Sequence, residues 1–245
     1  MAITGGGGGI GSALASAFQA AEAEVVTMDL EGRGADVALD VTDRLATASA
    51  FNALDRLDVV VVNAGVGIAG LSSDLDLDAW QRAIDVNVTG AVHTLLASVP
   101  RLRHQGRGAV VIMASLSGLV PTPLLTPYAM TKHALVGLGT SLRPELALDG
   151  VGVTVVCPGP VETNLLDAPS ATRGMSVRRY LTAAAGKPLS APVVAAAVVA
   201  GVRRNRSFVV PGRAGLIWRL QRLAPAVAAM QLARNMTAEL RAAKA

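Results

Sequence analysis

The chain has 245 residues, of which 51% are hydrophobic and 16% are charged, and its net charge is +4. This length allows one α/β domain with a sizeable core, and the low charged fraction argues against disorder. One cysteine and three histidines without ligand-like spacing exclude an intramolecular disulfide framework and predict no metal site.

Short β-rich segments alternate with longer helical patterns over the first two thirds of the chain, which predicts βαβ units. The β-rich segments are almost continuous Val and Ile runs, as expected where helices cover both faces of a strand. After a short first strand at 1–3, the predicted strands are Glu24–Met28, Asp36–Leu39, Asp58–Val62, Ala109–Ala114, Gly152–Cys157 and Phe208–Val210. The predicted helices between them are Ser12–Ala23, Thr42–Leu57, Leu77–Leu102 and Tyr128–Leu148. We therefore predict an α/β fold with a Rossmann-type, doubly wound parallel sheet over residues 1–213.

The last third of the chain differs in charge. Residues 1–172 hold nine Lys and Arg against seventeen Asp and Glu, whereas 173–245 hold thirteen against one, Glu239. The pattern predicts a loop over Asp167–Lys187, a helix over Ala191–Arg203 and a basic helical extension over 214–245. Such a surface can face nucleic acid, anionic lipid, an acidic partner or an anionic ligand. It can equally neutralise the acidic body of its own or a neighbouring subunit, and both interpretations stay open.

The basic extension is amphipathic. Its apolar residues Leu216, Ile217, Leu220, Leu223 and Val227 recur at helical spacing, with Arg213, Arg219, Arg222 and Arg234 as cations and Trp218 as an aromatic. The pattern suits a helix on an anionic membrane surface or a helix packed on another subunit. We expect the second use, in a homodimer or homotetramer. No nucleic-acid reader motif is present, so nucleic-acid binding is not expected. Without a signal peptide or a convincing span, the sequence predicts a cytoplasmic protein, with a peripheral membrane contact left open.

A glycine-rich loop joins the first predicted strand to the first helix. It contains Gly5–Gly9, Ile10 and Gly11. Glycines let the pyrophosphate of a dinucleotide approach the amides at a helix N-terminus. Asp29 ends the next strand twenty residues after Gly9, the spacing at which a carboxylate binds the adenosine ribose. Its charge would repel a 2′-phosphate, so we expect NAD rather than NADP. A flexible loop and an ordinary turn aspartate are the alternatives.

A tyrosine and a lysine share one face of a predicted helix, because Tyr128 and Lys132 are four residues apart. A free phenol titrates near pH ~10, and the neighbouring ammonium is expected to lower the pKa of Tyr128. Ser115 follows the strand Ala109–Ala114 at the carboxyl edge of the sheet, where open α/β folds bind ligands. We predict that Ser115 holds a substrate oxygen while Tyr128 moves the proton. A solvated helix face is the alternative for the pair alone.

Together these motifs resemble the classical short-chain dehydrogenase/reductase family across residues 1–215. The segment Thr4–Gly11 resembles its cofactor loop, Asp40 and Val41 its adenine contacts, and Asn63, Ala64 and Gly65 its sheet-stabilising Asn-Ala-Gly motif. The positions of its catalytic tetrad are occupied by Asn87, Ser115, Tyr128 and Lys132. The segment 158–163 is similar to its Pro-Gly segment, with Pro158, Gly159, Val161 and Thr163 at cofactor-contacting positions. The chain departs from the pattern at Gly8, Val62 and Cys157.

The resemblance implies reversible hydride transfer between a nicotinamide and a carbinol or carbonyl carbon. Tyr128 would be the general acid/base, and Ser115 would orient the substrate oxygen. Lys132 would lower the tyrosine pKa and hold the ribose, and Asn87 would hold a water that links Lys132 to solvent. The C-terminal part looks more like the steroid- or retinol-dehydrogenase-like members than β-ketoacyl-carrier-protein reductases.

We expect the substrate pocket to form from 116–126 and 165–187, with a contribution from the C-terminal helix. Its apolar residues are Leu119, Val120, Leu124, Leu125 and Leu166. They predict a small apolar alcohol or ketone as substrate. The competing hypothesis is a non-catalytic dinucleotide-binding redox sensor or scaffold, which has no need of Ser115 or Tyr128.

Overall fold

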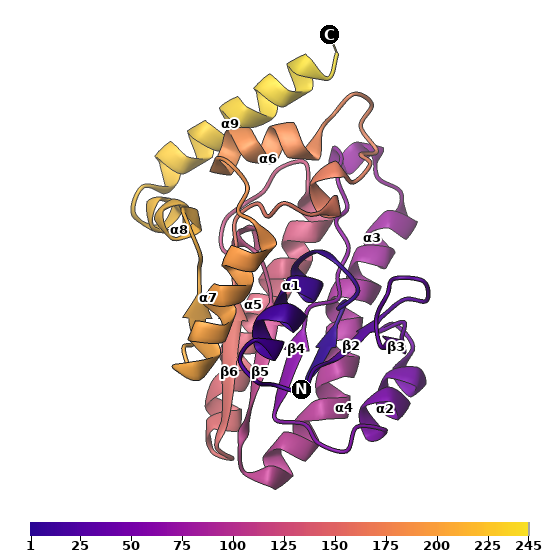
Figure 1. Cartoon of the computed structure of the whole chain (residues 1–245). Coiled ribbons are helices and arrows are strands. Elements are labelled where there is room, and N and C mark those ends of the chain that lie inside the picture. Colours follow the sequence, from indigo (N-terminus) through magenta and orange to yellow (C-terminus); the bar gives the residue numbers. More distant parts are fainter. Residues whose placement is uncertain (245) are drawn as a thin grey trace.

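A seven-stranded parallel sheet forms the centre of the computed structural model, which describes residues 1–244 (Figure 1). Its spatial order is β3-β2-β1-β4-β5-β6-β7. The strands are β1 (Ala2–Thr4), β2 (Val26–Asp29), β3 (Val37–Ala38), β4 (Val59–Val62), β5 (Gly108–Met113), β6 (Val151–Val156) and β7 (Phe208–Val209). The strand order reverses between β1 and β4, and ligands of open α/β sheets bind at such a point, beyond the carboxyl ends of the strands.

Helices cover both faces of this sheet. The helices of the described residues are α1 (Gly9–Gln19), α2 (Arg44–Asn52), α3 (Leu77–Ile84), α4 (Gly90–Gln105), α5 (Thr126–Ala147), α6 (Val177–Ala185), α7 (Ala191–Arg203), α8 (Ala214–Leu223) and α9 (Pro225–Ala242), of which the first five and α7 lie beside the sheet (Figure 1). On one face, Leu14 and Phe18 of α1 pack with Val194 and Val198 of α7. On the other face, α2, α4 and α5 supply Phe51, Leu95, Leu102, Leu135 and Leu146. The Val-rich strands β4 and β5 are buried between these two layers, as their sequence predicts.

The predicted α/β fold is confirmed, and the predicted strands are present with ends shifted by one or two residues. Two helical predictions need correction. The predicted helix Leu77–Leu102 is divided by a π-helical segment, Asp85–Thr89, into α3 and α4. The C-terminal stretch is two helices, because Pro225 cannot continue α8 and starts α9 instead. The predicted loop Asp167–Lys187 contains α6, which begins after the capping residue Ser176.

Helices α6, α8 and α9, which we call the roof helices, gather beyond one end of the sheet (Figure 1). Helix α9 packs against both α6 and α8. Of the predicted apolar stripe, Ile217 turns inward to pack near Ala214, whereas Leu216, Leu220, Leu223 and Val227 are exposed. No helix within residues 1–244 is both long enough and apolar enough to cross a membrane.

Candidate active site

The glycine loop makes a close turn between β1 and α1. Gly5 has a φ of +65°, in the left-handed region that glycine adopts without strain. A Cβ atom on Gly11 would lie 2.0 Å from the Gly5 carbonyl oxygen, so no side chain fits there. Gly8, by contrast, has open space around its Cα. The loop therefore depends on particular glycines rather than on the run as a whole.

Asp29 at the end of β2 holds this loop from the side. One carboxylate oxygen accepts a hydrogen bond from the Gly7 amide at 3.0 Å, and the other accepts one from the Leu30 amide at 2.8 Å. Asn63 holds the loop from β4, because its Nδ2 donates to the carbonyl oxygens of Thr4 and Gly5 at 3.0 and 2.8 Å. Neighbouring strand ends thus fix the backbone that a pyrophosphate would approach.

A cleft of about 660 Å³ runs along the carboxyl edge of the sheet from this loop. This volume lies within the range of small-molecule and cofactor sites. Of the residues predicted to bind a cofactor, the cleft is lined by Gly5, Gly9, Ile10, Asp29, Asp40, Val41, Asn63, Ala64, Gly65, Tyr128, Lys132 and Thr163. An open glycine loop, a carboxylate at one end and a lysine at the other fit a nicotinamide dinucleotide.

Four residues of that prediction do not line the cleft. Gly11 is buried behind the loop, where it allows the close approach to Gly5. Pro158, Gly159 and Val161 line a second, smaller cavity instead. Sequence reasoning also missed two cations that line the cleft, Arg33 and Arg82. Arg33 lies only four residues beyond Asp29, and that proximity was the available signal.

The second cavity has a volume of about 110 Å³ and adjoins the cleft. Ser115 lines it, together with the apolar residues Leu116, Val120 and Leu166. Five residues line both spaces: Ile10, Ala114, Tyr128, Thr163 and Leu165. Tyr128 therefore stands between a cleft that fits a dinucleotide and a cavity that contains Ser115. The predicted pocket residues Leu119, Leu124 and Leu125 do not line the cavity and pack in the apolar core around it.

Lys132 is buried one helical turn from Tyr128 on α5. Its Nζ donates to the Met113 carbonyl oxygen at 2.9 Å and lies 5.5 Å from the centre of the Tyr128 ring. Burial lowers the pKa of Lys132 to about 8. The ammonium is therefore close to the tyrosine ring and close to releasing its proton near neutral pH.

The predicted lowering of the Tyr128 pKa is wrong for the protein without ligands. Burial raises the pKa of Tyr128 above its usual value, against a smaller lowering by a side-chain hydrogen bond with Ser115. The physical reason is desolvation, which disfavours both the phenolate and the ammonium in the same dry environment. The two side chains are neighbours as predicted, but burial determines the direction of both pKa shifts.

Asn87 lies behind the cleft in the π-helical segment and is fully buried. Its Oδ1 accepts from the Val66 amide at 2.7 Å, and its Nδ2 donates to the Val66 carbonyl and to Thr131 Oγ1. A Cβ atom on Gly65 would lie 3.1 Å from Asn87 Oδ1 and 3.5 Å from Lys132 Nζ. The amide oxygen and the ammonium thus face the same small space beside Gly65, although Asn87 lines neither cavity.

Cys157 lies at the end of β6, beneath the same group of side chains. It is completely buried, and this burial raises the pKa of its thiol to about 12. The thiol is therefore neutral and unreactive at physiological pH.

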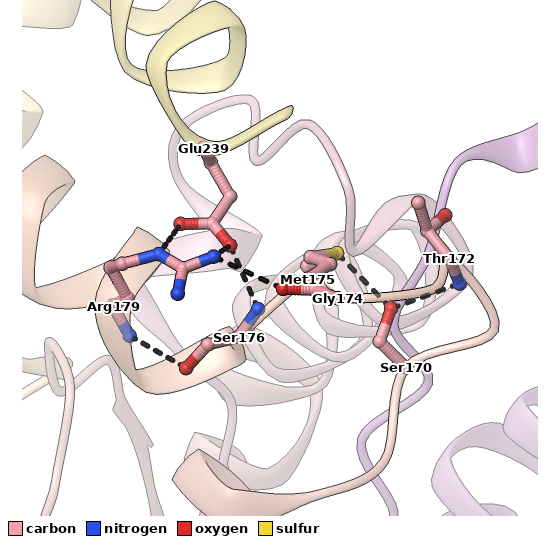
Figure 2. Close-up of polar contacts among 7 residues, drawn as sticks. All are labelled: Ser170, Thr172, Gly174, Met175, Ser176, Arg179 and Glu239. Carbon is pink, nitrogen blue, oxygen red and sulfur yellow. Dashed lines mark hydrogen bonds and ion pairs between the residues drawn. The ribbon is translucent and has the colours of Figure 1, made fainter. Parts of the chain in front are cut away.

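The roof helices also line the small cavity, through Tyr180 and Leu181 of α6, Ile217 of α8 and Leu232 of α9. An ion pair between a half-exposed arginine and a buried glutamate joins α9 to α6 (Figure 2). Arg179 donates from Nε and from a terminal nitrogen to the two oxygens of Glu239, at 2.7 and 2.6 Å. Glu239 also accepts from the Ser176 amide at 2.8 Å. Glu239, the only Asp or Glu of residues 173–245, therefore joins α9 to α6.

Comparisons with known proteins agree with this geometry. The family model for short chain dehydrogenases matches residues 1–174. D-β-hydroxybutyrate dehydrogenase of Rhizobium meliloti is 33% identical over 189 residues, which cover 67% of this chain and 72% of the relative. The 2-(S)-hydroxypropyl-CoM dehydrogenase 3 of Xanthobacter autotrophicus is 36% identical over 182 residues, which cover 66% and 71% of the two chains.

Solved structures show the same fold. A short-chain dehydrogenase from Streptomyces avermitilis superposes with a TM-score of 0.81 at 23% identity, over 96% of this chain and 97% of the other. Levodione reductase superposes with a TM-score of 0.74 at 25% identity, over 88% and 96% of the two chains.

The chain belongs to the short-chain dehydrogenase family. It is a nicotinamide-dependent oxidoreductase that acts on an alcohol or a ketone.

Proposed function

We propose that the protein transfers a hydride between NAD and the carbinol or carbonyl carbon of a compact, largely apolar molecule. The observation that carries the proposal is the position of Tyr128 between the two cavities, with Ser115 on the substrate side and Lys132 on the cofactor side. A non-catalytic dinucleotide sensor or scaffold has no use for this arrangement.

In the proposed reaction, the bound nicotinamide supplies or accepts the hydride. Ser115 holds the substrate oxygen, and the Tyr128 hydroxyl donates a proton to it during reduction and takes the proton back during oxidation. Lys132 binds the nicotinamide ribose, and its pKa of about 8 makes it a suitable partner for proton exchange near neutrality. Asn87 keeps the space beside Gly65 polar, where we propose that a water connects Lys132 to solvent.

Replacing Tyr128 with Phe tests this proposal. Because general acid/base catalysis contributes about 10²–10⁴ in rate, turnover should fall at least about a hundredfold. NADH binding, followed by its fluorescence, should stay nearly intact because the aromatic ring remains. Near-native turnover by Tyr128→Phe would rule out the assignment, and no turnover of any alcohol by the wild type would favour the sensor or scaffold.

The size and lining of the small cavity support a compact apolar substrate. A cavity of about 150 Å³ accommodates a benzene molecule, so a volume of about 110 Å³ limits the enclosed part of the substrate to about one small ring, with the reacting group facing the adjoining cleft. The steroid- or retinol-dehydrogenase-like branch stays a prediction, and such a substrate would require the roof helices to move outward.

Asp29 supports NAD rather than NADP as the cofactor. Its carboxylate lines the cleft at the end of β2, where a 2′-phosphate would meet its negative charge. Arg33 lines the same part of the cleft and favours the opposite cofactor. Because Asp29 is fixed by two backbone amides while Arg33 is exposed, we propose that Asp29 dominates. The ratio of kcat/KM for NAD and NADP measures this preference, and a higher value with NADP would contradict it.

The exposed apolar face of α8 and the start of α9 supports self-association into a homodimer or homotetramer. Leu216, Leu223 and Val227 are 64%, 84% and 50% exposed there. A monomer in sedimentation velocity would contradict this proposal, and binding to anionic vesicles would favour the peripheral membrane contact instead. The cytoplasmic location stays a prediction.

A further inference from the structure

Tyr180 of α6 carries a buried hydroxyl without a hydrogen-bond partner. The residue is only 1% exposed, and its neighbours in the surrounding cluster are apolar, among them Leu125, Met175 and Val177. Within residues 1–244, its oxygen is the one buried side-chain polar atom that no group satisfies. Burial raises the pKa of Tyr180, so the hydroxyl keeps its proton and can both donate and accept.

This hydroxyl contrasts with the other buried polar side chains. Asn87, Thr94 and Ser98 each reach a partner within the fold. A buried polar group without a partner costs about 1–3 kcal/mol, and a phenylalanine would fill the same place without that cost. The phenol is therefore a stability liability that becomes favourable only when something in the cavity binds it.

Tyr180 lines the same small cavity as Ser115 and Tyr128, but it comes from the roof. The two residues before it on α6 each bind carboxylates. Arg178 binds Asp167 and Glu162. Figure 2 shows that Arg179 binds Glu239. The first turn of α6 is further fixed by Ser176, whose side chain accepts from the Arg179 amide. These contacts join α6 to neighbouring segments, so Tyr180 lines the cavity from a helix rather than from a loop.

The cavity walls restrict what this hydroxyl can bind. No charged side chain among residues 1–244 lines the cavity. A carboxylate or phosphate would therefore enter without a counter-charge and lose its hydration, which is strongly unfavourable. A neutral oxygen needs only one hydrogen bond, and the Tyr180 hydroxyl provides it.

We propose that Tyr180 binds a second, uncharged oxygen of the substrate, so that the natural substrate is a compact alcohol or ketone with a further hydroxyl or carbonyl group. This inference rests on the proposed function, because it takes Ser115 and Tyr128 as the groups at the reacting oxygen. Tyr180 is then a specificity residue that selects substrates by a contact away from the reacting carbon.

Matched cyclohexanones test the proposal. The oxygenated probes are 1,4-cyclohexanedione and 3- and 4-hydroxycyclohexanone, and the control is 4-methylcyclohexanone, which has a similar shape without the second oxygen. One hydrogen bond to a buried phenol should favour the best oxygenated probe over the control by about tenfold or more in kcat/KM. Tyr180→Phe should lose that preference, measured as the ratio of kcat/KM for the best oxygenated probe to kcat/KM for the methyl compound within each protein. Equal preferences in wild type and Tyr180→Phe would overturn the proposal.

Stability provides a second measurement that does not depend on turnover. Because Tyr180→Phe removes an unsatisfied group, its free energy of unfolding without ligand should equal or exceed that of the wild type. A clear loss of stability would show that the hydroxyl already has a partner in the fold, which would also overturn the proposal.

Binding separates this inference from the proposed function. Calorimetric titration of the same probes into Tyr128→Phe, with and without Tyr180→Phe, measures recognition without chemistry. The best oxygenated probe should bind about tenfold more weakly to the double variant than to Tyr128→Phe, whereas the methyl control should bind both proteins equally. If binding depends on Tyr180 but the wild-type protein turns over none of the probes, the proposed function is refuted and this inference is not. Turnover without any dependence on Tyr180 would refute this inference alone.

Discussion

The cleft and the roof are built by different means. Around the cleft, the backbone of the glycine loop and the strand ends forms the wall, and the side chains of Asp29 and Asn63 fix that backbone through its amides and carbonyls. The roof helices are held by side-chain packing and by the Arg179–Glu239 pair. Backbone positioning leaves little freedom, which suits a cofactor of constant shape. Side-chain positioning can change residue by residue, which suits a cavity that selects one substrate.

The Arg179–Glu239 pair offers the largest expected effect on stability. Arg179→Met leaves a carboxylate that is only 2% exposed without its counter-charge, and we expect a loss of about 2–3 kcal/mol, at the low end for a buried pair because Arg179 is half exposed. Glu239→Gln should lose only about 1 kcal/mol, since the amide oxygen can still accept from Ser176 and the arginine can reach water.

Urea unfolding of both variants measures this asymmetry. NADH affinity should remain at the wild-type value in each, because the cleft does not depend on the roof. Loss of NADH binding in Arg179→Met would show that the two regions are coupled.

Substitutions at two glycines test the glycine loop of the cleft. Gly11→Ala places a methyl group 2.0 Å from the Gly5 carbonyl oxygen, and such overpacking should lower the free energy of unfolding by about 1–3 kcal/mol. Gly8→Ala is the matched control, because its backbone is extended and nothing lies within 4 Å of the new atom. Its stability should stay within about 0.5 kcal/mol of the wild type. Equal losses in both variants would contradict the described loop.

Lys132 should also make the free energy of unfolding depend on pH. The folded protein releases this proton at a pKa of about 8, whereas the unfolded chain keeps it to 10.5. Between these values the unfolded state binds more protons, so stability rises with pH by up to about 1.4 kcal/mol per unit. The raised pKa of the Cys157 thiol opposes this rise above about pH 9, and the raised pKa values of Tyr128 and Tyr180 oppose it above about pH 10, where these groups ionise in the unfolded chain.

The measurement compares wild type with Lys132→Met at about pH 7.5 and about pH 9.5, within this window. The stability of the wild type relative to the variant should increase between the two. A constant difference would show that the ammonium is solvated in the folded protein.

The cleft was more predictable from the sequence than the roof. Glycines, strand-ending Asp29 and the Tyr128–Lys132 spacing are local signals, and each residue lies near where that signal places it. The positions of the strands along the chain followed from Val-rich runs alternating with helices. Sequence reasoning could not foresee the direction of the Tyr128 pKa, because burial depends on how distant segments close around the ring.

The roof was less predictable because its contacts join distant residues. No local pattern shows that Glu239 would meet Arg179, sixty positions earlier. A signal did exist, since a lone carboxylate among thirteen cations needs a reason. Pro225 also marked the break between α8 and α9. The π-helical segment that buries Asn87 had no signal in the sequence that we can identify.

The buried thiol of Cys157 makes the chain convenient for optical experiments. It is the sole cysteine in the sequence, and neither its exposure nor its ionisation favours alkylation. A cysteine introduced at an exposed position of α9, such as Met230, could therefore carry a fluorophore without prior removal of the native thiol. Such a dye would report in real time whether the roof helices swing aside when a ligand enters.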